Sequence, residues 1–215
     1  MLNKFIESTL LRADATEEDF NKLFAEARKY KFYAVCIHPA YIELARAALA
    51  GSGVKVVAVV AFPFGANDSI VKAFETAIAI ADGADEIDMV MNITAMKSKN
   101  YGYILDEFAE VKRACKKKPL KVIIETDLLT RDEIVMACKL CIKAKVDFVK
   151  TSTGYVKDGR GATAENVRLI ARTLASSGIK IKASGGIRDR KTAMAMIAAG
   201  AQRIGTSAGA AIMEG

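Results

Sequence analysis

The feature that most constrains this chain is a repeated junction between a helical pattern and a strand pattern. At four places a polar segment with helical spacing ends at a glycine, and a run rich in β-branched residues follows within one or two positions. The glycines are Gly53, Gly83, Gly178 and Gly200. A glycine just past a helix end adopts the left-handed backbone conformation without a clash from a Cβ atom. The repeat therefore predicts helices that each lead directly into a buried strand.

Eight strand patterns occur along the chain, and helical patterns separate them. We expect strands at Phe5–Thr9, Tyr33–Ile37, Val54–Ala61, Glu86–Met91, Lys121–Thr126, Asp147–Ser152, Ile179–Ala183 and Arg203–Thr206. The expected helices include Glu17–Tyr30, Asp68–Ala81, Tyr103–Lys117, Arg131–Lys145 and Ala164–Ser176. Capping boxes at Thr16 and Thr130 mark the start of two of them. Strict alternation of strands and helices is typical of right-handed βαβ units with a parallel sheet.

Eight such units in 215 residues predict an α/β protein with a single domain, residues 1–215, folded as a closed (β/α)8 TIM barrel. No linker or shift in composition divides the chain. A doubly wound open sheet is the alternative, but its glycine pattern G-x-G-x-x-G does not follow the first strand. We therefore expect the reacting groups at the carboxyl ends of barrel strands.

Composition and charge exclude several other classes of protein. The longest apolar run, Val56–Phe64, has nine residues, whereas a membrane-spanning helix needs about 20. No leader pattern is visible, so we expect a cytoplasmic protein without a membrane partner. The net charge of +7 raises nucleic acid as a partner, but the basic residues are scattered, and the run Lys116–Lys118 falls at an expected helix end. We expect no nucleic-acid partner, and the basic balance suits small anionic substrates.

Histidine and cysteine are too sparse for most metal or disulfide chemistry. His38 is the single histidine, and the four cysteines are scattered. Cys138 and Cys141 form a C-x-x-C pair inside the expected helix Arg131–Lys145, where buried helix cysteines are a simpler interpretation than a redox or zinc site. Packing is also the simplest explanation of Cys36. We therefore expect no metal site and no cofactor.

Ionisable residues interrupt four of the expected strands, at positions where a barrel core would take valine or isoleucine. They are Asp88, Lys121, Lys150 and Lys182, and Lys180 lies on the same strand as the last of these. Buried charges are costly unless they are paired, so their convergence on one cavity indicates a function. For Lys121 and Lys180, a side chain that faces the helix layer explains the residue equally well.

A lysine in such a cavity indicates imine chemistry. An unperturbed amine, with a pKa of about 10.4, is almost fully protonated at pH 7. A neighbouring ammonium group and partial desolvation both favour the neutral, nucleophilic form. Lys150 and Lys182 are the candidates, and the residues alone do not say which is the nucleophile. Asp88 would carry protons, since imine formation, carbon–carbon cleavage and hydrolysis all move them.

Glycine-rich loops follow the last two expected strands. They are Ala183-Ser-Gly-Gly-Ile-Arg188 and Gly205-Thr-Ser-Ala-Gly209, and Gly154 closes the turn after Lys150. Glycines let backbone N–H groups approach an anion, and barrels often bind phosphate at the loops after strands seven and eight. The two loops together predict a phosphate site.

Five motifs closely resemble those of the deoxyribose-phosphate aldolase family. They are Phe62-Pro-Phe-Gly-Ala-Asn67, Glu86-Ile-Asp-Met-Val-Met-Asn92, Lys121-Val-Ile-Ile-Glu-Thr126, Val149-Lys-Thr-Ser-Thr-Gly154 and Lys182-Ala-Ser-Gly-Gly-Ile-Arg188. The resemblance extends over nearly the whole chain. It implies a class I aldolase of deoxyribose phosphate catabolism, which works through a Schiff base without a metal. Its substrate would be 2-deoxy-D-ribose 5-phosphate, cleaved reversibly to D-glyceraldehyde 3-phosphate and acetaldehyde.

The same resemblance implies roles for individual residues. Lys150 is implied as the Schiff-base lysine, Lys182 as the lysine that perturbs it, and Asp88 as the proton-transfer acid. The implied substrate- and phosphate-binding residues are Gly154, Ser184, Gly185, Gly186, Arg188, Gly205 and Ser207, with Thr9 and Lys121 as further candidates. A homo-oligomer, either a dimer or a tetramer, is also expected.

Two features depart from the family pattern. The first strand reads Ile6-Glu-Ser-Thr9 where the family commonly has Ile-Asp-His-Thr. The chain also stops at Gly215, without the tyrosine-ended tail of some members. Two alternative functions stay open at this point. One is an imine-forming aldolase of the same fold that acts on another phosphorylated sugar, and the other is a phosphosugar-binding barrel without chemistry.

Overall fold

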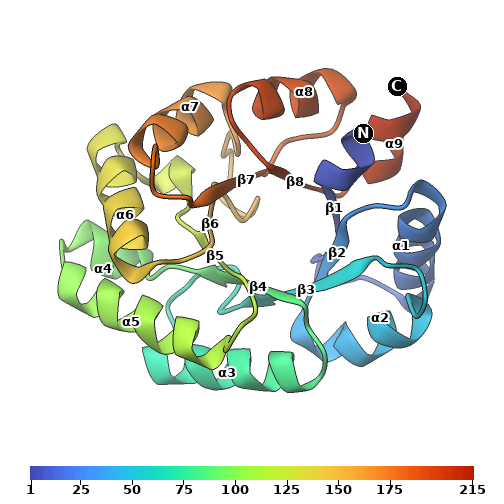
Figure 1. Cartoon of the computed structure of the whole chain (residues 1–215), viewed down its shortest axis with the longest axis horizontal. Coiled ribbons are helices and arrows are strands. Elements are labelled where there is room, and N and C mark those ends of the chain that lie inside the picture. Colours follow the sequence, from blue (N-terminus) through green and yellow to red (C-terminus); the bar gives the residue numbers. More distant parts are fainter.

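In the computed structural model, which describes residues 1–215, eight parallel strands close into a barrel in sequence order. The strands are β1 (Ile6–Thr9), β2 (Ala34–Ile37), β3 (Lys55–Val60), β4 (Glu86–Val90), β5 (Leu120–Ile123), β6 (Phe148–Lys150), β7 (Lys180–Ser184) and β8 (Arg203–Thr206). Figure 1 looks along the barrel and shows the helices as an outer ring. The expected (β/α)8 barrel is confirmed, and an open sheet is excluded because β8 pairs with β1.

The outer ring contains nine helices. They are α1 (Glu17–Tyr30), α2 (Ile42–Ala48), α3 (Ser69–Ala81), α4 (Ile93–Lys97), α5 (Tyr101–Ala114), α6 (Arg131–Ala144), α7 (Ala164–Thr173), α8 (Arg190–Ala198) and α9 (Gly209–Glu214). Three 3-10 turns are η1 (Leu2–Phe5), η2 (Pro39–Tyr41) and η3 (Thr126–Leu128). Both predicted capping boxes are present, at Thr16 and Thr130. None of the helices combines the length and the hydropathy of a membrane span.

The junctions between helices and strands have the predicted backbone conformation. The φ angles are +73° at Gly53, +107° at Gly83, +78° at Gly178 and +118° at Gly200. Lys31 after α1 and Lys145 after α6 are left-handed as well, although they are not glycines. The junction therefore requires the left-handed turn, and glycine is the residue that makes it with least strain.

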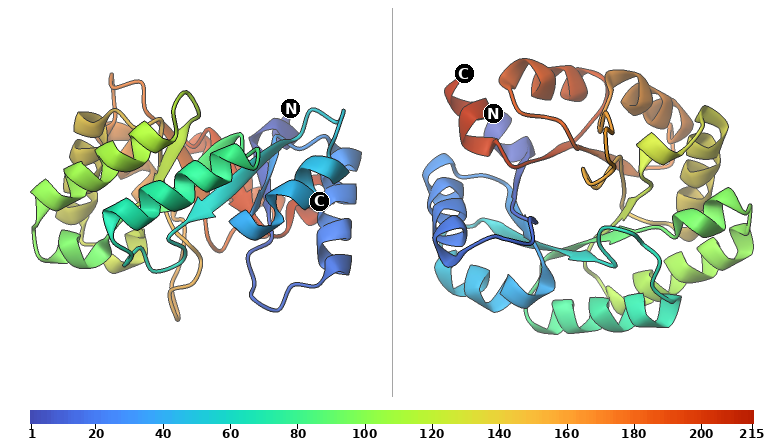
Figure 2. Two further views of the ribbon diagram at one scale, coloured as in Figure 1. Left: turned by 90° about the horizontal axis from the view of Figure 1, so that it is seen from below. Right: turned by 180° about the vertical axis from the view of Figure 1, so that it is seen from behind.

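The two ends of the chain meet on one side of the barrel. In Figures 1 and 2 the amino-terminal turn and α9 lie side by side. Helix α9 packs against α1 and β1, and Tyr30 of α1 donates a hydrogen bond to Glu214 of α9. The last helix thus covers the seam at which β8 meets β1.

The inside of the barrel divides into an apolar part and a charged part. The apolar part lies next to β2 and β3 and contains the buried residues Leu11, Ala34, Cys36, Val57 and Val59. The charged part contains the buried residues Glu7, Glu86, Asp88, Lys121, Lys150 and Lys182. Successive side chains of a strand point to opposite faces, so a separate cluster of 49 buried residues packs between the strands and the helices.

A buried ion pair in the helix layer fixes the end of β4. Lys72 of α3 and Glu107 of α5 are both fully buried, and their Nζ and Oε1 atoms are 2.5 Å apart. Lys72 Nζ also donates to the carbonyl of Val90, and Glu107 Oε2 accepts from the backbone N–H of Asn92. Burial lowers the pKa of Lys72 and raises that of Glu107, so each group needs the other to stay charged.

We expect Lys72→Met to lower the free energy of unfolding by about 3–5 kcal/mol, because Glu107 would be left as an unpaired buried charge. The double variant Lys72→Met/Glu107→Leu should recover part of this loss, since it removes both charges. Urea unfolding of the three proteins measures the difference. A double variant no more stable than the single variant would contradict this account of the pair.

Candidate active site

The charged part of the interior is organised around Asp88, which lies in the middle of β4. Its Oδ1 atom is 2.9 Å from Lys121 Nζ, and its Oδ2 atom is 2.8 Å from Lys150 Nζ and 2.7 Å from Lys182 Nζ. One carboxylate therefore binds three lysine side chains from β5, β6 and β7. Lys150 and Lys182 are register partners on neighbouring strands, which places both at the same level of the barrel.

Two further carboxylates balance the remaining charge. Glu86 Oε2 is 2.7 Å from Lys121 Nζ, and Glu7 accepts a hydrogen bond from Lys182. Three buried lysines thus face three buried carboxylates. A buried ion is tolerated only when it is paired and hydrogen-bonded, so the cluster is held together by the balance of its charges. Glu7, in the position that departs from the family pattern, is one of these partners.

The neighbouring charges also fix the protonation states in the cluster. Burial alone would raise the pKa of Asp88, but the three lysines lower it well below its usual range. Burial alone would lower the pKa of Lys182, but Asp88 and Glu7 raise it above the ordinary value. The pKa of Lys121 is raised in the same way. At neutral pH, Asp88 is therefore a carboxylate, and Lys121 and Lys182 are ammonium groups.

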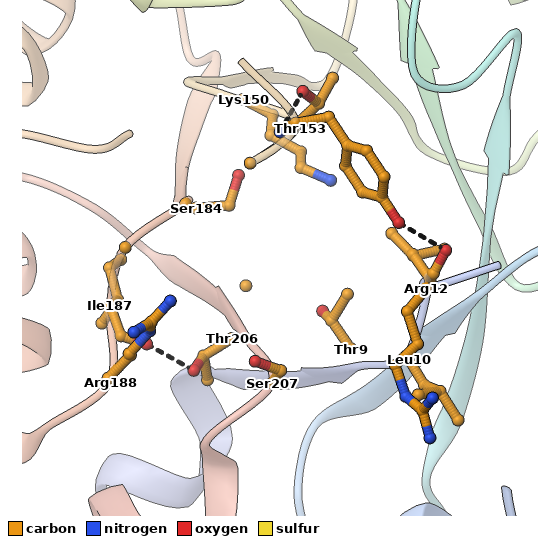
Figure 3. A pocket seen from close by; sticks show the side chains of 16 residues that line it. Thr9, Leu10, Arg12, Lys150, Thr153, Ser184, Ile187, Arg188, Thr206 and Ser207 are labelled. Atoms are coloured by element: carbon orange, nitrogen blue, oxygen red, sulfur yellow. Dashed lines mark hydrogen bonds between the residues drawn. The ribbon is translucent and has the colours of Figure 1, made fainter. Parts of the chain in front are cut away.

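A cavity of about 280 Å³ opens above this cluster, and Lys150 is the one lysine that lines it. Figure 3 shows the Lys150 side chain directed into the cavity, with Ile187 and Arg188 on one side and Thr9 and Leu10 on the other. The lining includes eight residues expected to bind substrate: Thr9, Gly154, Ser184, Gly185, Gly186, Arg188, Gly205 and Ser207. The structure therefore brings together almost the whole set expected from the sequence.

Lys121, the remaining candidate for substrate binding, belongs to the charged cluster. Its side chain points into the barrel, but it is fully buried and bound to Asp88 and Glu86, and it does not line the cavity. Lys180 is exposed at the amino end of β7 and takes no part in the cluster. Asp88 and Lys182 are fully buried as well, so they act on a bound molecule only through Lys150 or after the site rearranges.

Glycines shape one wall of the cavity. The φ angles are +85° at Gly154, +87° at Gly185 and +74° at Gly186. A Cβ atom on Gly185 would lie 3.0 Å from the Cα of Gly161, and one on Gly186 would lie 3.0 Å from the carbonyl oxygen of Arg160. The backbone N–H groups of these three cavity glycines have no acceptor within the protein. Such free donors are suited to an anion.

Gly205 has a role that sequence reasoning missed. A Cβ atom at this position would lie 2.9 Å from Cε of Lys182 and 3.0 Å from Cβ of Ser184. The φ angle of Gly205 is ordinary, so the reason for glycine is space and not backbone conformation. Gly205 lines the cavity as expected, and it also leaves space for the side chain of Lys182.

The other singled-out residues have structural environments. Cys36 is buried with its Sγ atom 3.8 Å from Asp88 Oδ2, and burial raises its pKa. Cys138 and Cys141 are buried, free thiols of α6, as the helix interpretation predicts. His38 bonds the carbonyl of Leu11 through Nε2. No group of three or more histidine, cysteine, aspartate or glutamate side chains is arranged to hold a metal ion.

A closed parallel barrel with ionisable groups and a polar cavity at the carboxyl ends of its strands has the architecture of a (β/α)8-barrel enzyme. Comparison with known proteins identifies the family to which this barrel belongs. Residues 7–215 match the model of the DeoC/LacD family of aldolases. The chain therefore belongs to that family.

Relatives and solved structures agree with this assignment. The deoxyribose-phosphate aldolase of Mannheimia succiniciproducens is 52% identical, over 100% of this chain and 94% of the relative. That of Streptococcus sanguinis is 51% identical, over 100% of this chain and 96% of the relative. The structure of the aldolase QR15 superposes with a TM-score of 0.94 at 42% identity, covering 99% and 94% of the two chains. The tetrameric deoxyribose phosphate aldolase of Aeropyrum pernix gives 0.91 at 32% identity, covering 99% and 89%.

The charge cluster predicts a loss of stability in acid. Burial alone would raise the pKa of Glu86, but Lys121 lowers it to about 2, from an ordinary value of 4.5. A carboxylate with a lowered folded-state pKa stabilises the protein above its unfolded-state pKa, and this contribution disappears as the pH falls toward the folded-state value. We expect the free energy of unfolding to fall between about pH 4.5 and pH 2.

The variant Glu86→Gln isolates this contribution. It should be less stable than the wild type at pH 7, and its stability should change less as the pH falls through this range, because one titrating carboxylate is gone. Urea unfolding at a series of pH values measures both curves. Parallel curves for the two proteins would show that Glu86 does not contribute as described.

Proposed function

We propose that this chain reversibly cleaves 2-deoxy-D-ribose 5-phosphate to D-glyceraldehyde 3-phosphate and acetaldehyde through a Schiff base on Lys150. Family membership and the two relatives of 52% and 51% identity support the aldolase activity and this substrate. The chain is an aldolase, which is a carbon–carbon lyase. The alternative of a phosphosugar-binding barrel without chemistry is not supported, since it gives no reason for the buried lysines and Asp88.

The observation that carries the choice of nucleophile is the position of one amine. Lys150 lines the cavity, while Lys121 and Lys182 are fully buried and bound to Asp88. A carbonyl compound that enters the cavity meets the Nζ atom of Lys150 alone. The residues by themselves left Lys150 and Lys182 as equal candidates, and this difference in access supports Lys150.

The proposed reaction begins when Lys150 Nζ attacks the C1 aldehyde of the open-chain sugar, and water leaves as the iminium forms. The iminium accepts the electron pair of the C2–C3 bond. As that bond breaks, the C3 hydroxyl gives up its proton and becomes the aldehyde of glyceraldehyde 3-phosphate. The remaining enamine takes a proton at C2, and hydrolysis releases acetaldehyde and the free lysine. The lysine serves as the electron sink, so no cofactor enters the reaction.

Asp88 and Lys182 are placed to support these proton movements. Asp88 Oδ2 lies 2.8 Å from Lys150 Nζ, within reach of the proton that the amine gives up before it attacks. Lys182 shares the same oxygen atom, at 2.7 Å. Its persistent positive charge favours the neutral, nucleophilic form of a neighbouring amine. Asp88 would thus be the proton carrier and Lys182 the lysine that activates its neighbour.

The phosphate would bind at the far side of the cavity from the reacting carbon. Gly185, Gly186 and Ser207 offer backbone N–H groups without an internal acceptor. Arg188 adds a positive charge at the rim, where Figure 3 shows it beside Ile187. Loops after the seventh and eighth strands are the usual phosphate site of such barrels. Thr9 and Ser184 would contact the part of the sugar between the phosphate and Lys150.

We also propose that the protein works in the cytoplasm as a homo-oligomer. The four cysteines are free thiols, which fits a reducing compartment. The outer face of α3 is apolar along its length, with Ile70, Phe74 and Ile78 at 70%, 68% and 45% exposure. A continuous apolar face of this kind marks an interaction surface. The Aeropyrum pernix relative is described as a tetramer.

We expect Lys150→Ala to reduce turnover below about one hundredth of the wild type and to abolish the adduct trapped by borohydride with acetaldehyde, because no other amine reaches the cavity. Lys180→Ala is the matched control, since this lysine starts the adjacent strand outside the cluster, and it should keep both properties. Intact-protein mass spectrometry and peptide mapping measure the adduct. A normal adduct yield in Lys150→Ala would refute the assignment.

The substrate is tested by the product released. Release of acetaldehyde and not dihydroxyacetone phosphate distinguishes cleavage of deoxyribose 5-phosphate from cleavage of other phosphorylated sugars.

A second prediction separates the phosphate site from the chemistry. Gly186→Val places a branched side chain against the carbonyl of Arg160 and resists the positive φ. We expect kcat/KM for deoxyribose 5-phosphate to fall by at least about tenfold, or about 1.4 kcal/mol. The value for unphosphorylated deoxyribose should change much less. Gly178→Val, at a left-handed turn with open space around it, controls for backbone strain. Equal losses on both substrates would place the phosphate elsewhere.

A third prediction concerns the assembly. Phe74→Glu should shift the protein toward the monomer in size-exclusion chromatography with light scattering, because a buried charge would face the apolar surface of the neighbouring copy. Met194→Glu is the matched control, as Met194 is 48% exposed on α8, across the ring from α3 in Figure 1. An unchanged mass for Phe74→Glu would exclude the α3 face as the interface.

A further inference from the structure

A chain of hydrogen bonds outside the lysine cluster links the end of β5 to the loop after β1. Glu125 Oε2 accepts from the backbone N–H of Thr153 at 3.0 Å and from the Thr153 hydroxyl. The hydroxyl oxygen of Thr153 accepts in turn from the backbone N–H of Tyr155 at 3.1 Å. The Tyr155 hydroxyl then donates to the carbonyl of Leu11 at 2.7 Å. The segment that directly follows Lys150 is therefore held at both ends.

Aromatic contacts support the far end of this chain. The ring of Tyr155 meets Phe62 edge to face, with centroids 5.3 Å apart, and Phe62 meets His38 at 5.9 Å. His38 Nε2 lies 2.9 Å from the carbonyl oxygen of Leu11, the same atom that accepts from Tyr155. The loops after β1, β2 and β6 thus meet at one carbonyl group, and Phe62 from the loop after β3 packs against the rings of His38 and Tyr155.

These contacts build the wall that faces the glycine loops. Thr153, Tyr155 and Leu11 line the cavity together with Lys150. Figure 3 shows Leu10 and Arg12, the neighbours of Leu11 in sequence, across the cavity from Ile187 and Arg188, and one of its dashed lines is the bond from Tyr155 to Leu11. The distance between the two walls is therefore set on one side by glycine backbone and on the other by this chain.

The position of Glu125 is energetically expensive. Its side chain is 3% exposed, its Oε1 atom has no hydrogen-bond partner, and its backbone has a φ of +54°. A buried, partly satisfied carboxylate on a left-handed residue costs stability. Both hydrogen bonds of Glu125 are accepted from Thr153, one from its backbone and one from its side chain. Glu125 therefore fixes the conformation of the loop between Lys150 and Tyr155.

We propose that Tyr155 is a specificity-determining residue of the aldolase and that Glu125, acting through Thr153, is its positioning residue. Together they hold one wall of the cavity, formed by Leu11, Thr153 and Tyr155, in place opposite the glycine loops. The space between this wall and the glycine loops fits an unbranched sugar-phosphate chain that extends from Lys150. The inference rests on the proposed function. It assigns the wall to binding of the long substrate, and it gives the wall no part in the attack of Lys150 on a carbonyl.

The first test is Tyr155→Phe, which removes the hydroxyl and keeps the ring. Because the wall holds the sugar chain equally in the ground state and the transition state, its loosening should act on KM. We expect KM for deoxyribose 5-phosphate to rise by about five- to tenfold, the effect of one hydrogen bond, with kcat within about twofold. The rate of adduct formation with acetaldehyde and borohydride should equal that of the wild type. Tyr30→Phe, which removes a hydrogen-bonded hydroxyl on α1, should change none of these values.

The second test acts at the other end of the chain. Thr153→Val removes the hydroxyl that bonds Glu125 and Tyr155, and it should reproduce the KM defect, whereas Thr153→Ser, which keeps a hydroxyl, should restore it. For the double variant Thr153→Val/Tyr155→Phe, KM should exceed that of either single variant by no more than about twofold, since both substitutions break the same chain of hydrogen bonds. If the two increases in KM multiply in the double variant, Thr153 and Tyr155 act independently, and the proposed coupling between them is overturned.

Two results separate this inference from the function on which it rests. If the wild type forms no adduct and does not cleave deoxyribose 5-phosphate, the proposed function fails. If the wild type is active and Tyr155→Phe leaves KM unchanged, the wall has no role in specificity. A parallel loss of adduct formation in Tyr155→Phe would also overturn the inference, because the loop would then position Lys150 and not the substrate.

Discussion

The sharing of one carboxylate by three buried lysine side chains is the interaction on which the rest of the site depends. Lys121, Lys150 and Lys182 come from adjacent strands, and without Asp88 between them their charges would repel one another in a medium that screens poorly. Glu7 and Glu86 complete the balance. Loss of a carboxylate would leave an uncompensated buried charge, so the chemistry and the stability of the barrel interior cannot be altered separately.

This requirement explains how the interior is divided among the strands. The carboxylates lie on β1 and β4 and the lysines on β5, β6 and β7, while β2 and β3 supply the apolar filling. The glycine at position 205 of β8 leaves the space that the Lys182 side chain occupies. Each strand therefore contributes a charge, a partner for a charge, or the volume that keeps water and misplaced side chains away from them.

Much of this arrangement follows from local sequence, and the rest depends on contacts between distant residues. The barrel, the capping boxes and the left-handed glycines rest on short-range rules, so the sequence predicts them. The glycine loops and Lys150 were also expected at the cavity. The sequence does not predict the burial of Lys121, because the residue pattern of a short strand does not show which of its two faces points into the barrel. The pairing of Lys72 with Glu107 and the bond from Tyr155 to Leu11 join residues 35 and 144 positions apart, and no local pattern marks them.

The position of Asp88 beside Lys150 has a consequence for the covalent stage of the proposed reaction. The iminium formed on Lys150 is positively charged, and Asp88 Oδ2, 2.8 Å from Lys150 Nζ, already faces this position with a negative charge. The field at the reacting carbon is thus already present in the resting protein, and the surrounding dipoles need not reorganise when the covalent bond forms. By the same reasoning, a carbonyl compound that brought its own negative charge to Lys150 would be repelled by the carboxylate of Asp88. The barrel therefore selects uncharged reacting ends and leaves the anionic group of the substrate to the glycine loops at the rim.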